Sequence, residues 1–261
     1  MIRLRRDAVD SPSSHPPLRL KYVEAVLSIG FALTFIAWTR LSAPGPLAPN
    51  ADPSSSGGPF GLDLLLPAPV AYPRSAAGQL AEAFAILTHP LIVLAVTAAW
   101  VVYAYISRMR RLSVSLAIAA TGIPVQFLIA LHLARPTPGA TFTDSIAAFA
   151  HAYPNAHITA MTLASWVLVT LARAHHRSTM VAAGTVLGYA AVVMTAVSQW
   201  YMGLATLSDL IGGFLLGAAF ANLALWVGGI DAILTSWVNR RLSRASSEKR
   251  AAVIYNPTKF D

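Results

Sequence analysis

Residues 112–133 read LSVSLAIAATGIPVQFLIALHL and contain no aspartate, glutamate, lysine or arginine. A helix needs about 20 mostly apolar residues to cross the hydrocarbon core of a bilayer, so this stretch predicts a membrane-spanning helix. The whole chain agrees, because 56% of its residues are hydrophobic and only 11% are charged. Soluble domains contain about a quarter charged residues. A soluble fold of 261 residues would not bury this much apolar surface.

Five other stretches are similarly apolar, so the sequence predicts six membrane-spanning helices in all. These are Tyr22–Trp38, Pro90–Ile106, Leu112–Leu133, Ile158–Leu171, Met180–Val197 and Leu207–Val227. The fourth is short, and we expect it to extend to Ala174. The expected fold is therefore an all-α, polytopic membrane helical bundle with about six transmembrane helices.

The basic residues give the expected orientation. All lysines and arginines except Arg40, Arg74 and Arg135 fall on one side of the six expected spans. The positive-inside rule assigns that side to the cytoplasm, so we expect both chain ends there. The net charge of +8 is then a topology signal, and we expect no nucleic-acid partner. The chain has no cysteine, which excludes disulfides, thiolate metal sites and cysteine nucleophiles.

Spans and loops divide the chain into five parts. We expect a basic cytoplasmic leader (1–21), a first transmembrane helix (22–39), an outward loop rich in proline, glycine and serine (40–76), a membrane domain (77–230) and a basic cytoplasmic tail (231–261). Within the outward loop, Phe60–Leu66 predicts a short interfacial helix.

The first hydrophobic stretch has two interpretations. Leu41-Ser42-Ala43 resembles the small-residue cleavage site of a signal peptide. A charged leader precedes the stretch, however, and Glu24 and Trp38 lie at its ends. These features favour a retained anchor.

The second outward loop carries candidate site residues at both of its ends. It begins at Arg135-Pro136 and ends with the segment Pro154–His157, where the fourth span starts. Proline suits a helix start because its missing amide would be unpaired there anyway. The backbone amides that follow can bind an anion, and an imidazole at that place can donate a proton to a leaving oxygen. Alternatively, His157 only marks the start of an interfacial helix.

The third outward loop reads SQWYMGLATLSD from Ser198 to Asp209. Ser208 or Asp209 can cap the N-terminus of the sixth span. Trp200 and Tyr201 can be interfacial anchors. By itself, this loop indicates no chemistry.

Together, the two loops resemble the phosphatidic acid phosphatase type 2 superfamily, whose membrane members dephosphorylate lipid phosphates and diphosphates. The family pattern is KxxxxxxRP, then PSGH, then SRxxxxxHxxxD. Its counterparts here are Arg135-Pro136, the segment Pro154–His157, and Ser198–Asp209 without gaps. The order of the motifs, their spacing, the six-span layout and their common outward face agree over roughly residues 75–228.

Several positions depart from the family pattern. Leu128 stands at the lysine, Asn155 and Ala156 at the serine and glycine of the second motif, Gln199 at the arginine of the third, and Ala205 at its histidine. In the family, that last histidine attacks phosphorus, the aspartate orients it, and the second-motif histidine protonates the leaving group. The lysine and the two arginines hold the phosphate.

The resemblance implies catalytic roles for His157 and Asp209, and phosphate binding by Arg135, Asn155, Ser198 and Gln199. The methyl group of Ala205 cannot be a nucleophile, and no histidine follows His176 in the chain. Each charge-assisted hydrogen bond contributes about 1.5–3 kcal/mol, so losing two family cations should weaken dianion binding by orders of magnitude. Without a histidine partner, Asp209 is alternatively only a helix cap.

Three outward histidines are candidates to replace the missing nucleophile, namely His89, His132 and His151. Each also fits an interfacial or hydrogen-bonded histidine. A metal-activated water needs about three converging protein ligands, and the sequence shows no such spacing. We therefore expect neither a metal nor a cofactor.

Gly213 and Gly217 are separated by three residues within the sixth span. Such small-residue spacing allows two helices to approach closely. The close partner can be another helix of the same chain or of a second copy.

Two functional hypotheses follow. The missing nucleophile favours a non-catalytic relative that binds a lipid phosphate or diphosphate, with a polyprenyl carrier as one candidate. The alternative is an active phosphatase or phosphotransferase that uses Arg135 and His157 by an altered mechanism. The expected surroundings are the lipid bilayer of a bacterial inner (plasma) membrane, with the site on the non-cytoplasmic face. The non-catalytic relative can alternatively bind a membrane partner, and the sequence does not identify any protein partner.

Overall fold

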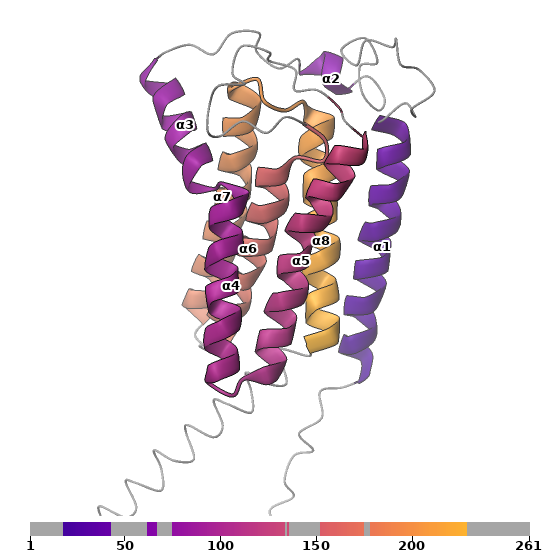
Figure 1. The fold of residues 1–261 in the computed structure, drawn as a ribbon, viewed down its shortest axis with the longest axis vertical. Helices are drawn as coiled ribbons and strands as arrows, with labels where there is room; N and C mark the ends of the chain where they lie inside the picture. The colour runs from indigo at the N-terminus through magenta and orange to yellow at the C-terminus, as the bar shows by residue number, and fades with distance from the viewer. Residues whose placement is uncertain are drawn as a thin grey trace, which may run out of the picture.

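A computed structural model describes residues 18–42, 62–66, 75–133, 135, 152–174 and 178–228, and these residues are helical with short turns and no strand. Figure 1 shows a bundle of long helices, with α2 and α3 at one end. The helices are α1 (Leu18–Ser42), α2 (Leu62–Leu65), α3 (Ala76–Leu87), α4 (Pro90–Ile106), α5 (Arg110–Leu133), α6 (Ala156–Ala174), α7 (Ser178–Tyr201) and α8 (Leu207–Gly228).

Five stretches of helix are long and apolar enough to cross a membrane. They are Tyr22–Ser42, Ala76–Ile106, Arg110–Leu133, Thr179–Tyr201 and Leu207–Val227. Large hydrophobic side chains cover the outside of these helices, as with Ile29 at 60% exposed and Val186 at 66%. Such a surface is stable in lipid and not in water. The expectation of an all-α integral membrane protein is confirmed.

The fourth expected span corresponds to α6, which runs from Ala156 to Ala174 and contains the apolar stretch Ala156–Val169. This helix packs against α4, α5, α7 and α8, and it carries buried polar residues. Thr159 Oγ1 donates to the carbonyl oxygen of Gly213 at 3.1 Å, and Ser165 Oγ donates to that of Gly188 at 2.9 Å. These bonds place the polar side chains of α6 against protein and not against lipid. The number of six spans stays a prediction.

Helix α3 was not expected. Thr88 Oγ1 donates to the carbonyl oxygen of Phe84 at 2.9 Å, and His89 then caps α4, whose first residue is Pro90. The turn separates α3 from α4 because proline cannot supply an amide to a continuous helix. In Figure 1, α3 leans away from the bundle axis.

Helix α1 is part of the bundle and lies along α8 (Figure 1). Ser28 Oγ donates to the carbonyl oxygen of Ala219 at 3.1 Å. Phe35 is buried in a cluster with Leu215 and Leu216. The start of α1 and the end of α8 lie at the same end of the bundle, opposite α2.

The two spaced glycines face α6. A side-chain carbon at Gly213 would lie 2.5 Å from the carbonyl oxygen of Asn155, and one at Gly217 would lie 2.8 Å from Cβ of Thr162. The close approach expected from the spacing is therefore present within one chain. The short helix expected at Phe60–Leu66 is present as α2. Residues 1–17 of the leader, most of the outward loop, His151 and the tail from 231 lie outside the described residues.

Candidate functional site

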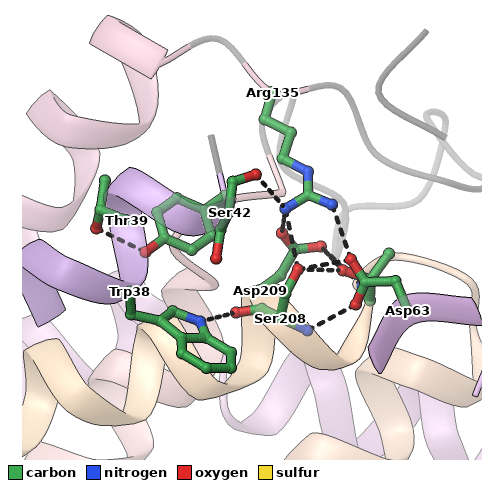
Figure 2. A network of polar contacts seen from close by, with 9 residues as sticks. Trp38, Thr39, Ser42, Asp63, Arg135, Ser208 and Asp209 are labelled. Carbon is green, nitrogen blue, oxygen red and sulfur yellow. Dashed lines mark hydrogen bonds and ion pairs between the residues drawn. The ribbon is translucent and has the colours of Figure 1, made fainter. Parts of the chain in front are cut away.

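Arg135 lies just after α5 and contacts two carboxylates at once (Figure 2). Its Nη2 atom is 3.1 Å from Oδ2 of Asp63, and its Nη1 atom is 3.1 Å from Oδ1 of Asp209. Nη1 also donates to Oγ of Ser208 at 3.0 Å and to the carbonyl oxygen of Ser42 at 3.5 Å. The exposed fractions of the charged side chains are 10% for Arg135, 9% for Asp63 and 0% for Asp209. When all three groups are ionised, the two carboxylates outweigh the charge of the single guanidinium, so the cluster carries no excess of positive charge.

The Asp63 carboxylate also lies at the N-terminus of α8. Its Oδ1 accepts from the backbone amide of Ser208 at 2.9 Å, and its Oδ2 accepts from Oγ of Ser208 at 2.7 Å. Amides in the first turn of a helix have no partner within the helix, and the helix dipole favours negative charge there. Asp63 therefore occupies a place suited to an anion.

Asp209 has two roles at this helix start. Its Oδ2 accepts from the backbone amide of Thr206 at 2.7 Å and from Thr206 Oγ1 at 2.8 Å. Both bonds run from Thr206, the residue before α8, to the third helical residue, and they satisfy donors at the helix N-terminus. Asp209 is thus the third residue of α8 and not the N-cap that the sequence suggested, because the helix begins at Leu207. Its other oxygen, Oδ1, faces Arg135.

Asn155 joins the second motif to the third. Its backbone amide donates to the carbonyl oxygen of Asp209 at 3.1 Å, and its Nδ2 lies 3.3 Å from Oε1 of Gln199. Its Oδ1 accepts from the amide of Ile158 at 3.0 Å, so Asn155 caps α6, which begins at Ala156. Pro154 thus precedes the cap and is not the first helical residue. The carboxylate of Asp63 lies at the N-terminus of α8 and not at that of α6.

His157 lies in the first turn of α6 with an exposed fraction of 1%. Its ring meets that of His89 edge to face, with centroids 5.6 Å apart and planes at 88°. A hydrogen bond also connects His157 to the backbone of Ala85. Of the three histidines considered as substitutes, His89 lies beside His157, whereas His132 is exposed near the end of α5.

The remaining residues of the third motif are buried. Ser198 Oγ donates to the carbonyl oxygen of Ala81 at 2.6 Å and so ties α7 to α3. Gln199 is 2% exposed, and Ala205 is 0% exposed in a cluster with Ile158 and Leu210. Gly203 has a φ of 68° in the turn between α7 and α8, a conformation that favours glycine.

Tyr153 connects the segment before α6 to α1. Its ring stacks on Phe35 with centroids 6.4 Å apart, and its hydroxyl lies 2.7 Å from Oγ1 of Thr39. Burial raises the pKa of Tyr153 to about 12, so the hydroxyl stays protonated at physiological pH. The first helix therefore contacts the loop that carries the second motif.

Sequence reasoning missed two residues and misplaced one. Asp63 was not singled out, although it is an acid within the apolar segment Phe60–Leu66. Gln126 was also missed; it is 2% exposed and its Nε2 donates to the carbonyl oxygen of Pro154 at 2.6 Å. A polar residue in the middle of an expected span was the available signal. Leu128, at the family lysine position, is 67% exposed on the outside of α5 and does not line the site.

No family model matches the chain, and no curated protein or solved structure matches it. In the part of the chain that the structure describes, no three histidine, aspartate or glutamate side chains converge as ligands for a metal ion. What the described site offers is one guanidinium, the hydroxyl and amide of Ser208, and two carboxylates. This set can hold an anionic group but contains no nucleophile at position 205.

Proposed function

We propose that this protein is a membrane relative of the phosphatidic acid phosphatase type 2 superfamily that binds a lipid phosphate or diphosphate without hydrolysing it. The observation that carries the proposal is the meeting of all three motif regions at one end of the bundle. Arg135 contacts Asp209 at 3.1 Å, and Asn155 contacts both Asp209 and Gln199. The family resemblance requires this convergence, because its motifs surround one phosphate.

The donors around Arg135 support the binding half of the proposal. The guanidinium and the amide and hydroxyl of Ser208 all point to the same carboxylate of Asp63. Phosphate oxygens accept from the same kinds of donor, and a planar guanidinium matches two of them at once. A lipid phosphate can therefore use this donor set in place of the carboxylate.

Ala205 supports the non-catalytic half. The methyl group lies at the family position of the attacking histidine and packs against Ile158 and Leu210. With no imidazole there, the phosphohistidine step of the family has no nucleophile. Gln199 replaces a cation that would stabilise the charge of the transition state.

The surroundings belong to the same proposal. Six helices cross the membrane, α6 among them, and both chain ends are cytoplasmic. The first residues of α1 and the last residues of α8 lie at the same end of the bundle, which supports this layout. The Arg135 site then faces the non-cytoplasmic side of a bacterial inner membrane, where a lipid head group reaches it from the outer leaflet.

A binding and release assay tests the proposal. The protein in detergent is offered phosphatidic acid and polyprenyl diphosphate, and both retention of lipid and release of phosphate are measured. We expect binding without release, and we expect the Arg135→Gln variant to lose the binding. Arg111→Gln, a change of an exposed arginine on α5, is the matched control and should bind as the wild type does. Absence of lipid binding in a folded protein contradicts the proposal.

The contact between His89 and His157 favours one alternative, an active phosphatase or phosphotransferase with an altered mechanism. There, Arg135 holds the phosphate, His157 protonates the leaving group, and His89 supplies the imidazole that position 205 lacks. The rings are 5.6 Å apart by their centroids. Phosphate release that disappears in both His157→Ala and His89→Asn supports this alternative and excludes the non-catalytic function.

A further inference from the structure

Helix α2 presents two different faces. The side chain of Asp63 is 9% exposed, whereas Leu64, Leu65 and Leu66 are 67%, 76% and 43% exposed. The helix has four residues, and a helix this short is not stable by itself in water. Its placement on the bundle therefore depends on the contacts of Asp63 and on the bond from Trp200 Nε1 to the carbonyl oxygen of Leu66 at 3.4 Å.

Asp63 takes the donors that an anionic ligand would need. Its carboxylate accepts from the Ser208 amide at 2.9 Å, from Ser208 Oγ at 2.7 Å and from Arg135 Nη2 at 3.1 Å. Figure 2 shows the side chains of Asp63 and Asp209 converging on the guanidinium from two different helices. A phosphate group cannot share these donors with Asp63, since the two anions would overlap and repel each other.

Of the two carboxylates, Asp63 is the one that can leave. Asp209 is 0% exposed, and its Oδ2 is held by the amide and hydroxyl of Thr206 within the first turn of α8. Asp63 reaches the site from a four-residue helix that has no buried residue and in which Leu64 and Leu65 are exposed. Removal of Asp63 takes one negative charge away from Arg135 and opens the amide of Ser208.

We infer that Asp63 is an internal competitor for the phosphate site, and that a lipid phosphate binds by displacing α2. This inference rests on the proposed function. The structure is then the closed state, in which the carboxylate occupies the place of the phosphate. The exposed leucines of α2 suit the membrane interface, where apolar side chains of a short amphipathic segment are stable after release.

The shared ligand chemistry is a phosphate monoester or diphosphate, which a lipid head group or a soluble phosphate can supply. The test compares dioctanoyl phosphatidic acid in detergent with inorganic pyrophosphate, by titration of wild type, Asp63→Asn and Arg135→Gln. Asparagine keeps the shape of the side chain and removes its charge. We expect Asp63→Asn to raise the affinity for the phosphate ligand by about tenfold or more. Tighter binding of phosphatidic acid than of pyrophosphate identifies the lipid as the ligand, and the reverse identifies the soluble anion.

Glu82→Gln is the matched control, because it removes one carboxylate from α3 at the same end of the bundle. It should leave the affinity unchanged. If binding depends on Arg135 but Asp63→Asn binds no more tightly than the wild type, the competitor inference is wrong and the proposed function stands. If Arg135→Gln binds as well as the wild type, the proposed function itself is wrong.

A second measurement follows α2 directly and uses the native Asp63. The chain has no cysteine, so Leu65→Cys accepts a single spin label at a position that is 76% exposed. We expect the spectrum of the label to show faster motion at saturating ligand, because α2 has left its contacts. An unchanged spectrum at full occupancy of the site overturns the inference.

Discussion

The backbone amide of Asn155 donates a 3.1 Å hydrogen bond to the carbonyl oxygen of Asp209. This bond fixes the start of α6 against the first turn of α8, two segments that are far apart in the sequence. It requires the two helices to approach closely, and Gly213 permits that approach because a side-chain carbon there would lie 2.5 Å from the carbonyl oxygen of Asn155. Backbone packing, rather than any single side chain, thus brings the second and third motifs together.

Gly213→Ala should therefore destabilise the protein. The added methyl group forces α6 and α8 apart, and overpacking of this kind costs about 1–3 kcal/mol. The change is measured as a lower thermal unfolding temperature in detergent. Gly30→Ala is the control, because no atom lies within 4 Å of a side-chain carbon at Gly30. Equal unfolding temperatures for the two variants would show that α6 and α8 leave room for a methyl group at Gly213.

Removal of the guanidinium should cost stability as well as binding. The side chain of Asp209 is 0% exposed. In Arg135→Gln, its carboxylate stays buried but loses its cationic partner. Removing one member of a buried ion pair costs about 3–5 kcal/mol. Chemical or thermal unfolding should show the loss, and Arg135→Lys should recover part of it. If Arg135→Gln unfolds at the same midpoint as the control Arg111→Gln, the ion pair does not stabilise the protein.

A double change at the third motif tests its alignment with the family. Ala205→His with Gln199→Arg restores the family nucleophile and one cation, and should produce phosphate release from phosphatidic acid where the wild type shows none. The imidazole must displace Ile158 and Leu210, which contact Ala205, so some loss of stability is expected. Gln199→Arg alone should remain inactive. A folded but inactive double variant indicates that position 205 does not correspond to the family histidine.

Cysteine labelling tests the expected orientation without background, since the chain has no cysteine of its own. Leu65→Cys on α2 and Ser107→Cys in the turn after α4 are both exposed and lie at opposite ends of the bundle. A membrane-impermeant maleimide added to intact cells should label the first variant. It should label the second only after permeabilisation. The opposite pattern reverses the topology given by the basic residues.

The sequence predicted the long helices well, because hydropathy depends only on neighbouring residues. The limits of the expected spans Pro90–Ile106 and Leu207–Val227 agree with α4 and with the apolar part of α8. Helix α3 was not predicted, since no separate element was assigned between the end of the expected loop at Ala76 and the span that begins at Pro90. The contacts of α6 with four other helices were not predictable either, because hydropathy does not show which helices pack together.

The site was predicted only in part. The residues of the three motifs were found through their order and spacing, and the structure brings Arg135, Asn155 and Asp209 together. Asp63 was not found, because its partner Ser208 lies 145 residues away in the sequence and no local pattern connects the two. A single acidic residue in a proline-rich loop belongs to no periodic pattern, so the sequence gives no sign of which residue it contacts.

The bond from Trp38 Nε1 to the carbonyl oxygen of Ser208, 3.0 Å long, has a practical consequence. Ser208 is the residue whose amide and hydroxyl hold Asp63, so the amino-terminal helix braces the same turn from the opposite direction. Shortened versions of the chain that begin after α1 would lose this brace together with the Thr39 contact to Tyr153. Ligand measurements therefore require protein that retains its first helix.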